Sequence, residues 1–236
     1  VTETVTHVKC FGDNTGIIDL DVSGGPPPYV YNWTTGQSSD LITGLTAQTY
    51  VYTVVDSKLC QYSSSVIVTE PAQPLTVSSV ITDANCFGDA NGGIDLTVTG
   101  GTAPYSYEWE NSTYVLSTVA QDLVNYPSDS YTYRILDSNN CFETGTLFID
   151  EPPMLESTIV GVDILCKYGN TGSIDLTVTG GVLPYGYTWS NGPISEDQTG
   201  LTAGYYEVEI LDDHNCLLID SITLTEPQDS LSYDYL

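Results

Sequence analysis

Three stretches of this chain repeat one another so closely that the fold must consist of copies of one small unit. In each copy a Cys is followed 23 residues later by a Trp, and a later Tyr is followed ten residues later by a second Cys. Agreement at this many offsets is far beyond chance, and a fixed period of this length indicates a tandem array. The sequence therefore predicts repeats over residues 1–73, 74–153 and 154–228, with the start of a fourth repeat at 229–236.

Apolar residues within a repeat recur at every second position, which is the period of a half-buried strand. In the second repeat, for example, Ile94, Leu96 and Val98 share one face, while Asp95 and Thr97 lie on the other. Gly-Gly pairs and segments rich in Asn and Asp supply the turns. Six or seven short strands in about 75–80 residues predict an all-β fold, with three tandem immunoglobulin-like β-sandwich repeats that form an elongated array.

Two aromatic positions recur in phase with the repeats. The Trp ends a Pro-Tyr-x-Tyr-x-Trp run whose aromatic residues share one strand face, and it takes the place of the central Trp of a sandwich. The recurring Tyr precedes the penultimate strand and resembles a tyrosine corner. We expect a structural role in the core for six residues: Trp33, Trp109, Trp189, Tyr50, Tyr131 and Tyr206.

The charge balance excludes several classes of partner. The chain has 236 residues and 31 acidic side chains against four basic ones, which gives a net charge of −27. Nucleic acid and anionic membranes bind through cationic side chains, so neither is an expected partner. The sequence also lacks an apolar run of about 18 residues, and we therefore expect no membrane insertion of this segment.

Two cysteines per repeat predict disulfide bonds, because a unit of this size has only a marginal core of its own. Disulfides persist in oxidising compartments, so we expect an extracellular protein. The default pairing lies within repeats, as Cys10–Cys60, Cys86–Cys141 and Cys166–Cys216. In a strict seven-strand topology, however, the two cysteines of one repeat lie at opposite poles. Bridges between repeats, Cys10–Cys141 and Cys86–Cys216, would then be closer and would leave Cys60 and Cys166 for neighbouring repeats.

Catalysis is poorly supported by the sequence. The chain has only His7 and His214, and neither recurs among the repeats, so no repeated general base is present. We therefore expect a protein that is not an enzyme.

Calcium is the one cofactor that the sequence suggests, because oxygen-rich turns suit a hard cation. Against this, Asp and Asn are common in turns. In addition, Asp19, Asp95 and Asp175 lie on the outward-facing positions of their predicted strands. The candidate ligands are Asp13, Asn14, Asp19, Asp56, Asp89, Asn91, Asp95, Asp137, Asn170, Asp175 and Asp212.

The segment from Cys86 to Trp109 reads Cys-x-Gly-x-x-x-Gly-x-Ile-Asp-Leu-x-Val-x-Gly-Gly-x-x-Pro-Tyr-x-Tyr-x-Trp. This string resembles the SprB repeat, which occurs in very large surface proteins of Bacteroidota and is named for a gliding-motility adhesin. The segments from Cys10 to Trp33 and from Cys166 to Trp189 resemble it with small departures, such as Tyr168 in place of a Gly.

The resemblance implies export by type IX secretion and display at the cell surface, associated with the outer membrane. We therefore expect a non-catalytic stalk or filament segment of a giant adhesin with a role in gliding motility. Its expected partners are neighbouring repeats of the same long chain, surface polysaccharide, and the secretion or motility machinery. Two alternatives are repeats that bind polysaccharide or protein directly, and accessory domains of a secreted hydrolase. The phylum also O-glycosylates Asp-Ser/Thr-apolar sites, which here implies Ser221 and Ser230.

Overall fold

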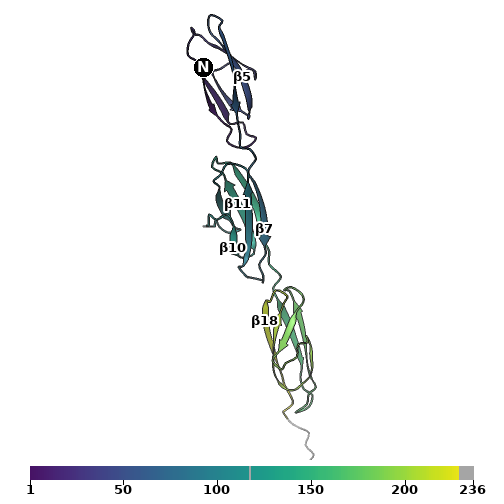
Figure 1. The fold of residues 1–236 in the computed structure, drawn as a ribbon. Coiled ribbons are helices and arrows are strands. Elements are labelled where there is room, and N and C mark those ends of the chain that lie inside the picture. Colours follow the sequence, from purple (N-terminus) through teal and green to yellow (C-terminus); the bar gives the residue numbers. More distant parts are fainter. Residues whose placement is uncertain (117, 229–236) are drawn as a thin grey trace, which may run out of the picture. The chain divides into compact units, whose positions relative to one another are not determined.

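The computed structural model of the chain describes residues 1–116 and 118–228 (Figure 1). These residues form 18 β-strands and no helix, so the described part contains no helix that could cross a membrane. The all-β prediction is confirmed. The start of a fourth repeat, expected at 229–236, lies outside the described residues, as does Ser230.

The first repeat folds into two antiparallel sheets of three strands each. Their orders are β1-β2-β4 and β3-β5-β6, so the second strand of the chain lies between the first and the fourth. This arrangement corresponds to an immunoglobulin-like sandwich with one strand fewer than the seven of the constant type. The strands are β1 (Thr2–Thr6), β2 (Gly16–Asp21), β3 (Val30–Trp33), β4 (Leu41–Leu45), β5 (Gln48–Val55) and β6 (Gln61–Val68).

The second repeat has the same strand order. Its sheets are β7-β8-β10 and β9-β11-β12. The strands are β7 (Thr76–Thr82), β8 (Gly92–Thr99), β9 (Ser106–Glu110), β10 (Leu123–Tyr126), β11 (Asp129–Leu136) and β12 (Phe142–Ile149).

The third repeat has this order as well, with sheets β13-β14-β16 and β15-β17-β18. Its strands are β13 (Glu156–Val162), β14 (Gly172–Thr179), β15 (Gly186–Trp189), β16 (Gln198–Leu201), β17 (Gly204–Leu211) and β18 (Leu217–Leu224).

The recurring aromatic residues are buried in every repeat. Trp33, Trp109 and Trp189 are no more than 5% exposed, and each indole N–H donates to a backbone carbonyl beyond its strand. Tyr50 and Tyr206 are also buried, and the hydroxyl of each donates to the carbonyl four residues earlier, as a tyrosine corner does. Tyr131 is fully buried. The alternation in β8 follows the pattern read from the sequence, with Ile94 and Leu96 buried and Asp95 exposed.

By its internal contacts the chain divides into two compact units, and the boundary between them falls inside the second repeat. One unit contains Val1–Val80, Asp95–Asp122 and Ser130–Leu147, and the other contains Ile81–Ile94, Leu123–Asp129 and Phe148–Leu236. Each unit therefore joins a complete outer repeat to part of the central one. The exact repeat boundaries at 73 and 153 stay a prediction of the sequence.

Candidate functional site: the cysteine junctions

The second cysteine of each repeat follows a hairpin loop whose shape is held by one Asp side chain. In the second repeat Asp137 is 4% exposed, and its Oδ1 accepts hydrogen bonds from the backbone N–H groups of Asn139 (2.8 Å) and Cys141 (2.9 Å). Its Oδ2 accepts a third from the N–H of Thr102 (2.9 Å). Asn140 has a φ of 64°, in the left-handed region that Asn tolerates better than most residues. The carboxylate thus fixes the backbone from which Cys141 projects.

The equivalent loops of the other two repeats are built in the same way. Asp212 is 4% exposed, and its Oδ1 accepts from the N–H of Cys216 at 2.9 Å. Asp56 accepts from the N–H of Cys60, also at 2.9 Å. Three independent copies of one loop indicate that the Asp four residues before the second Cys positions that thiol.

The first cysteine of each repeat lies in a loop that is held by the Glu of the Glu-Pro dipeptide. The backbone N–H two residues after the Cys donates to this carboxylate, and its residue has a positive φ between 65° and 79°. The pairs are Gly12 with Glu70 (2.6 Å), Gly88 with Glu151 (2.7 Å), and Tyr168 with Glu226 (2.6 Å). Because the Glu stands two residues after the last strand of its repeat, the first Cys lies near the end of that strand.

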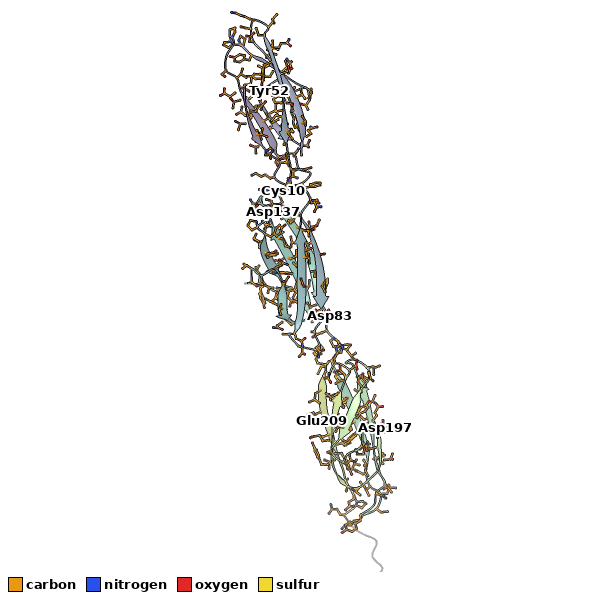
Figure 2. The ribbon with its side chains drawn as sticks, viewed as in Figure 1. Cys10, Tyr52, Asp83, Asp137, Asp197 and Glu209 are labelled. Atoms are coloured by element: carbon orange, nitrogen blue, oxygen red, sulfur yellow. A yellow bond between two sulfur atoms is a disulfide. The ribbon has the colours of Figure 1, made fainter. Side chains whose placement is uncertain are left out.

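The disulfides join successive repeats. Cys10 pairs with Cys141, and Cys86 pairs with Cys216, with Cα–Cα distances of 5.6 and 5.7 Å. In Figure 2, Cys10 and Asp137 mark the two sides of the first of these junctions. The within-repeat pairing expected by default is therefore wrong for these four cysteines. Of the six cysteines, all of them in the described part of the chain, Cys60 and Cys166 form no disulfide and are exposed.

The length of the last strand explains why the pairing within repeats fails. The second Cys immediately precedes this strand, whereas the first Cys lies at its far end. The strand has eight residues in each repeat (β6, β12 and β18), and at 3.2–3.4 Å per residue it spans about 25 Å. A disulfide requires Cα atoms within about 7 Å of each other. Each repeat therefore presents its two cysteines at opposite ends, where only another repeat can reach them.

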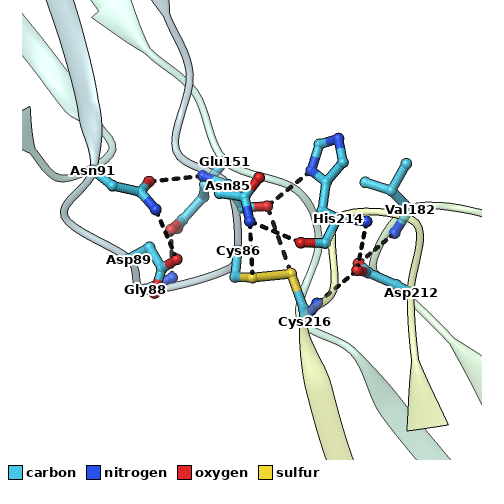
Figure 3. The surroundings of a disulfide bond; sticks show 10 residues. All are labelled: Asn85, Cys86, Gly88, Asp89, Asn91, Glu151, Val182, Asp212, His214 and Cys216. Atoms are coloured by element: carbon cyan, nitrogen blue, oxygen red, sulfur yellow. Dashed lines mark hydrogen bonds between the residues drawn. A yellow bond between two sulfur atoms is a disulfide. The ribbon is translucent and has the colours of Figure 1, made fainter.

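Hydrogen bonds accompany each disulfide. At the first junction the side-chain amide of Asn139 donates to the carbonyl of Lys9 at 3.0 Å. At the second, His214 Nδ1 lies 2.9 Å from the carbonyl of Asn85, and the Asn85 amide donates to the carbonyl of His214 at 2.9 Å (Figure 3). Because a carbonyl oxygen only accepts, His214 Nδ1 carries the proton of that bond. Asn139 and His214 both stand two residues before the second Cys, so they serve one recurring contact.

The other histidine also has a structural place. His7 lies three residues before the first Cys, where the other repeats have an Asp, and all three side chains accept a backbone N–H near the end of the last strand. In the third repeat the N–H and hydroxyl of Thr225 both donate to Asp163, which holds the pKa of that carboxyl below its ordinary value. The pairs are His7 with Thr69 (3.1 Å), Asp83 with Asp150 (3.0 Å), and Asp163 with Thr225 (2.7 Å).

The Gly-Gly pair holds the linker that enters the second and third repeats. The N–H of Gly101 donates to the carbonyl of Gln73 (3.0 Å), and that of Gly181 donates to the carbonyl of Pro153 (2.8 Å). A Cβ on Gly180 would lie 1.8 Å from the carbonyl oxygen of Met154, which is far inside contact distance. The first Gly of the pair thus leaves room for the linker, and the second binds it.

The calcium candidates do not converge in the structure. Among residues 1–116 and 118–228, no three His, Cys, Asp or Glu side chains come together as a metal-binding group. The hairpin residues Asp56, Asp137 and Asp212 use their oxygens for backbone N–H groups, and Asn91 hydrogen-bonds Asp89 at 3.0 Å. The remaining candidates are exposed side chains: Asp13, Asn14, Asp19, Asp95, Asn170 and Asp175. Calcium binding stays a prediction from the sequence alone, as does glycosylation of Ser221, which is exposed on β18.

Several junction residues were not singled out by the sequence reasoning. Asn139, Lys9 and Asn85 differ in type from their counterparts in the other repeats, so no pattern distinguishes them. The Glu of Glu-Pro does recur, and its constant offset from the second Cys was the available signal. A dipeptide that recurs at the end of a repeat does not by itself indicate what it contacts, and the bond from its carboxylate to the first Cys loop is visible only in the fold.

Comparison with known proteins finds a family whose model matches part of each repeat. The model of the SprB repeat matches residues 2–38, 78–114 and 158–193. Each match includes the first Cys and the Trp of a repeat and ends before the second Cys. The match thus covers one partner of every disulfide, while the Asp-x-x-x-Cys hairpin lies beyond it. No curated protein matched the chain.

Among solved structures, the chain is similar to eight N-terminal Ig domains of Down Syndrome Cell Adhesion Molecule isoform 1.30.30. The identity is 12%, the TM-score is 0.43, and the match covers 94% of this chain and 36% of that one. It is also similar to four N-terminal Ig domains of Dscam1 isoform 6.9, at 10% identity and a TM-score of 0.33 over 95% of this chain and 72% of that one. The amphioxus IgVJ-C2 molecule matches at 12% identity and a TM-score of 0.27, over 64% of this chain and 96% of its own.

The linker contact gives a matched pair of glycine substitutions. Gly180 and Gly24 both have a positive φ, of 76° and 85°, but a Cβ on Gly24 would meet nothing within 4 Å. Gly24→Ala should therefore cost only the left-handed strain of about 1–2 kcal/mol. Gly180→Ala should cost an additional 1–3 kcal/mol or so, because the Met154 carbonyl must move. Urea titration followed by tryptophan fluorescence measures both; equal losses would show that the linker does not rest on Gly180.

Proposed function

The chain belongs to the SprB repeat family, and on that premise we propose that it is a non-catalytic stalk segment of a giant adhesin displayed on a cell surface. The observation that supports this most directly is the double connection at each junction. A backbone linker and a disulfide both join one repeat to the next, as Cys10–Cys141 and Cys86–Cys216. A binding domain on a flexible tether has no need of a second covalent link, whereas a segment that transmits force benefits from one.

The bridges also shorten the covalent path along which tension would travel. From Val1 the shortest route follows the chain to Cys10, crosses to Cys141, returns to Cys86, crosses to Cys216 and continues to Gln228. This route contains about a third of the peptide bonds of the described chain. The remaining residues lie in loops that tension cannot extend while the bridges are intact.

The charge and the bridges fit an extracellular location. Disulfides between exposed loops persist in oxidising surroundings. The net charge of −27 favours solubility and opposes non-specific side-by-side association of arrays. Export by type IX secretion, association with the outer membrane and a role in gliding are supported by family membership, and they form the finer part of the proposal. The expected partners are further repeats of the same chain and the motility machinery.

Stretching single molecules tests the load-bearing role. With handles at residues 1 and 236, the fully unfolded oxidised chain should extend to roughly 30 nm and the reduced chain to roughly 80 nm, at 3.3–3.6 Å per residue. The Cys60→Ser/Cys166→Ser variant is the matched control, because it keeps both bridges and lacks the exposed thiols. The same extension with and without reductant would contradict a force path through the bridges.

Labelling of intact cells tests the location. Antibodies raised against residues 1–236 should label cells that make the full-length protein, and inactivation of type IX secretion should abolish the labelling while the protein accumulates inside. Protein that reaches the surface without that system would contradict the export route. A second comparison concerns gliding. If the unaltered cells are labelled but deletion of the gene leaves gliding unchanged, the motility role is wrong and surface display stands.

A further inference from the structure

Cys60 and Cys166 occupy complementary positions in the junction scheme. Both are exposed and free of disulfides. Cys60 is the second cysteine of its repeat, as Cys141 and Cys216 are, and Cys166 is a first cysteine, as Cys10 and Cys86 are. Every bridge in the chain joins a first cysteine to a second cysteine of another repeat. The two free thiols are therefore one first cysteine and one second cysteine, which are the two partners that every formed bridge combines.

The loop around Cys60 has the same geometry as the bridged second-cysteine loops. Asp56 Oδ1 accepts from the N–H groups of Lys58 and Cys60, both at 2.9 Å. Leu59 has a φ of 66°, against 64° for Asn140 and 62° for Asn215 at the same place. A positive φ is unfavourable for a Leu, so the hydrogen bonds of the loop must hold Leu59 in this conformation. The loop is thus preformed in the bridging shape although Cys60 is unpaired.

The loop around Cys166 likewise matches the bridged first-cysteine loops. The N–H of Tyr168 donates to Glu226, as Gly12 and Gly88 donate to their glutamates. The N–H of Leu165 donates to the hydroxyl of Thr171 at 3.0 Å, and Lys9 makes the same bond to Thr15 at 3.1 Å. The loops around Cys60 and Cys166 therefore both have the backbone conformation that is found around the bridged cysteines.

The polar contact beside each bridge can also form between the free halves. In the two formed junctions, the side chain two residues before the second cysteine donates a hydrogen bond. The acceptor is the backbone carbonyl of the residue that precedes the first cysteine. The corresponding residues are Lys58, whose ammonium is a donor, and Leu165, whose backbone carbonyl is an acceptor. Neither half has this complementarity with a copy of itself, because two Cys60 halves would bring donor to donor and two Cys166 halves would bring acceptor to acceptor.

We propose that Cys60 and Cys166 are the two halves of a further junction, and that each forms a disulfide with the opposite half on another SprB repeat. A second copy of this chain supplies such a repeat, so oxidised copies should join head to tail. The contact is heterologous and leaves a free half at each end, so the assembly stays open. The inference rests on the junction geometry alone, and it stands whether or not the array serves as a stalk.

The bond forms by thiol–disulfide exchange with oxidised glutathione. The Cys60 thiolate attacks one sulfur of glutathione disulfide, which gives a mixed disulfide and releases one glutathione thiolate. The Cys166 thiolate of the second molecule then attacks Cys60 Sγ and releases the second glutathione. Two thiols lose two electrons and two protons in total, and glutathione disulfide is reduced to two molecules of reduced glutathione.

Mixing two single variants tests the proposal. Cys60→Ser retains only the Cys166 half, and Cys166→Ser retains only the Cys60 half, while both keep the two native bridges. One variant is isotopically labelled, and equal amounts are incubated in a glutathione redox buffer and examined by non-reducing gel and intact mass. The mixture should give covalent heterodimers in at least tenfold excess over either homodimer. The unsubstituted chain should give a ladder of multimers, and the double variant should stay monomeric.

A positioning variant separates a preformed half from a merely reactive thiol. Asp56→Ala, placed in the Cys166→Ser chain, removes the acceptor that shapes the Cys60 loop and should lower the heterodimer yield at least fivefold. Asp95→Ala removes an equally charged side chain that is exposed in β8, and it should leave the yield unchanged. Equal losses from both substitutions would show that net charge, and not the loop, controls the reaction.

Two results overturn the proposal. If homodimers form as readily as heterodimers, so that heterodimers make up only the random half of all dimers, the two halves do not recognise each other. If both thiols end only as glutathione adducts, no junction forms. Either outcome leaves the Cys10–Cys141 and Cys86–Cys216 bridges, and the stalk proposal that rests on them, unaffected.

Discussion

The separation of the two cysteines by one full strand governs the architecture of this chain. The last strand of every repeat is eight residues long, with the second Cys at its start and the first Cys held near its end by the Glu of Glu-Pro. No relaxation of the loops closes a gap of about 25 Å in a hydrogen-bonded strand. Two cysteines that would form a disulfide within a small domain of another fold therefore bond to cysteines of other repeats here. The disulfides therefore join repeats to one another, and each sandwich is held together internally by its core of buried aliphatic and aromatic side chains.

The other recurring residues can be understood from this constraint. Asp137 and Asp212 shape the hairpins from which the second cysteines project, and both are buried beside the second Gly of the Gly-Gly pair. The two bridges overlap along the sequence, since Cys86 lies between Cys10 and Cys141. The central repeat is therefore linked to both of its neighbours, and opening either bridge leaves it attached through the other. At each junction the bridge adds to the peptide linker, so opening one bridge leaves those two repeats joined by the backbone alone.

Much of this fold follows from the sequence because its signals are local. The alternation of Ile94, Asp95 and Leu96 needs only one buried sheet face to be interpreted, and the structure confirms it. The phase of Trp and Tyr relative to the strands likewise predicts a core position, since a large aromatic on an inward face has few other places to go. The disulfide pairing is different, because it depends on which ends of the sandwich the loops reach. Both pairings are compatible with the spacing of Cys10, Cys60 and Cys141, and only the strand order separates them.

The functional residues at the junctions were hidden for a second reason. The contact beside the bridge uses a side-chain donor on one repeat and a backbone carbonyl on the other, and a carbonyl leaves no mark on the sequence. Asn139 and His214 satisfy it equally well, so the position varies in residue type while its role is constant. His7 illustrates the same point, since its Nδ1 replaces the carboxylates of Asp83 and Asp163 as a backbone acceptor. A histidine without a counterpart of its own type in the other repeats is thus an ordinary member of a recurring structural position.

Tryptic mapping of the monomeric fraction of the oxidised chain, in which no bond joins Cys60 of one copy to Cys166 of another, tests the junction scheme most directly under non-reducing conditions after alkylation of free thiols. Cleavage after Lys9, Lys58, Arg134 and Lys167 separates the cysteines into four peptides, 10–58, 59–134, 135–167 and 168–236. Bridges between repeats predict two separate pairs, 10–58 with 135–167 and 59–134 with 168–236, with Cys60 and Cys166 alkylated. Bridges within repeats would instead hold all four peptides together as a single species. Recovery of that four-peptide species would contradict the covalent joining of successive repeats.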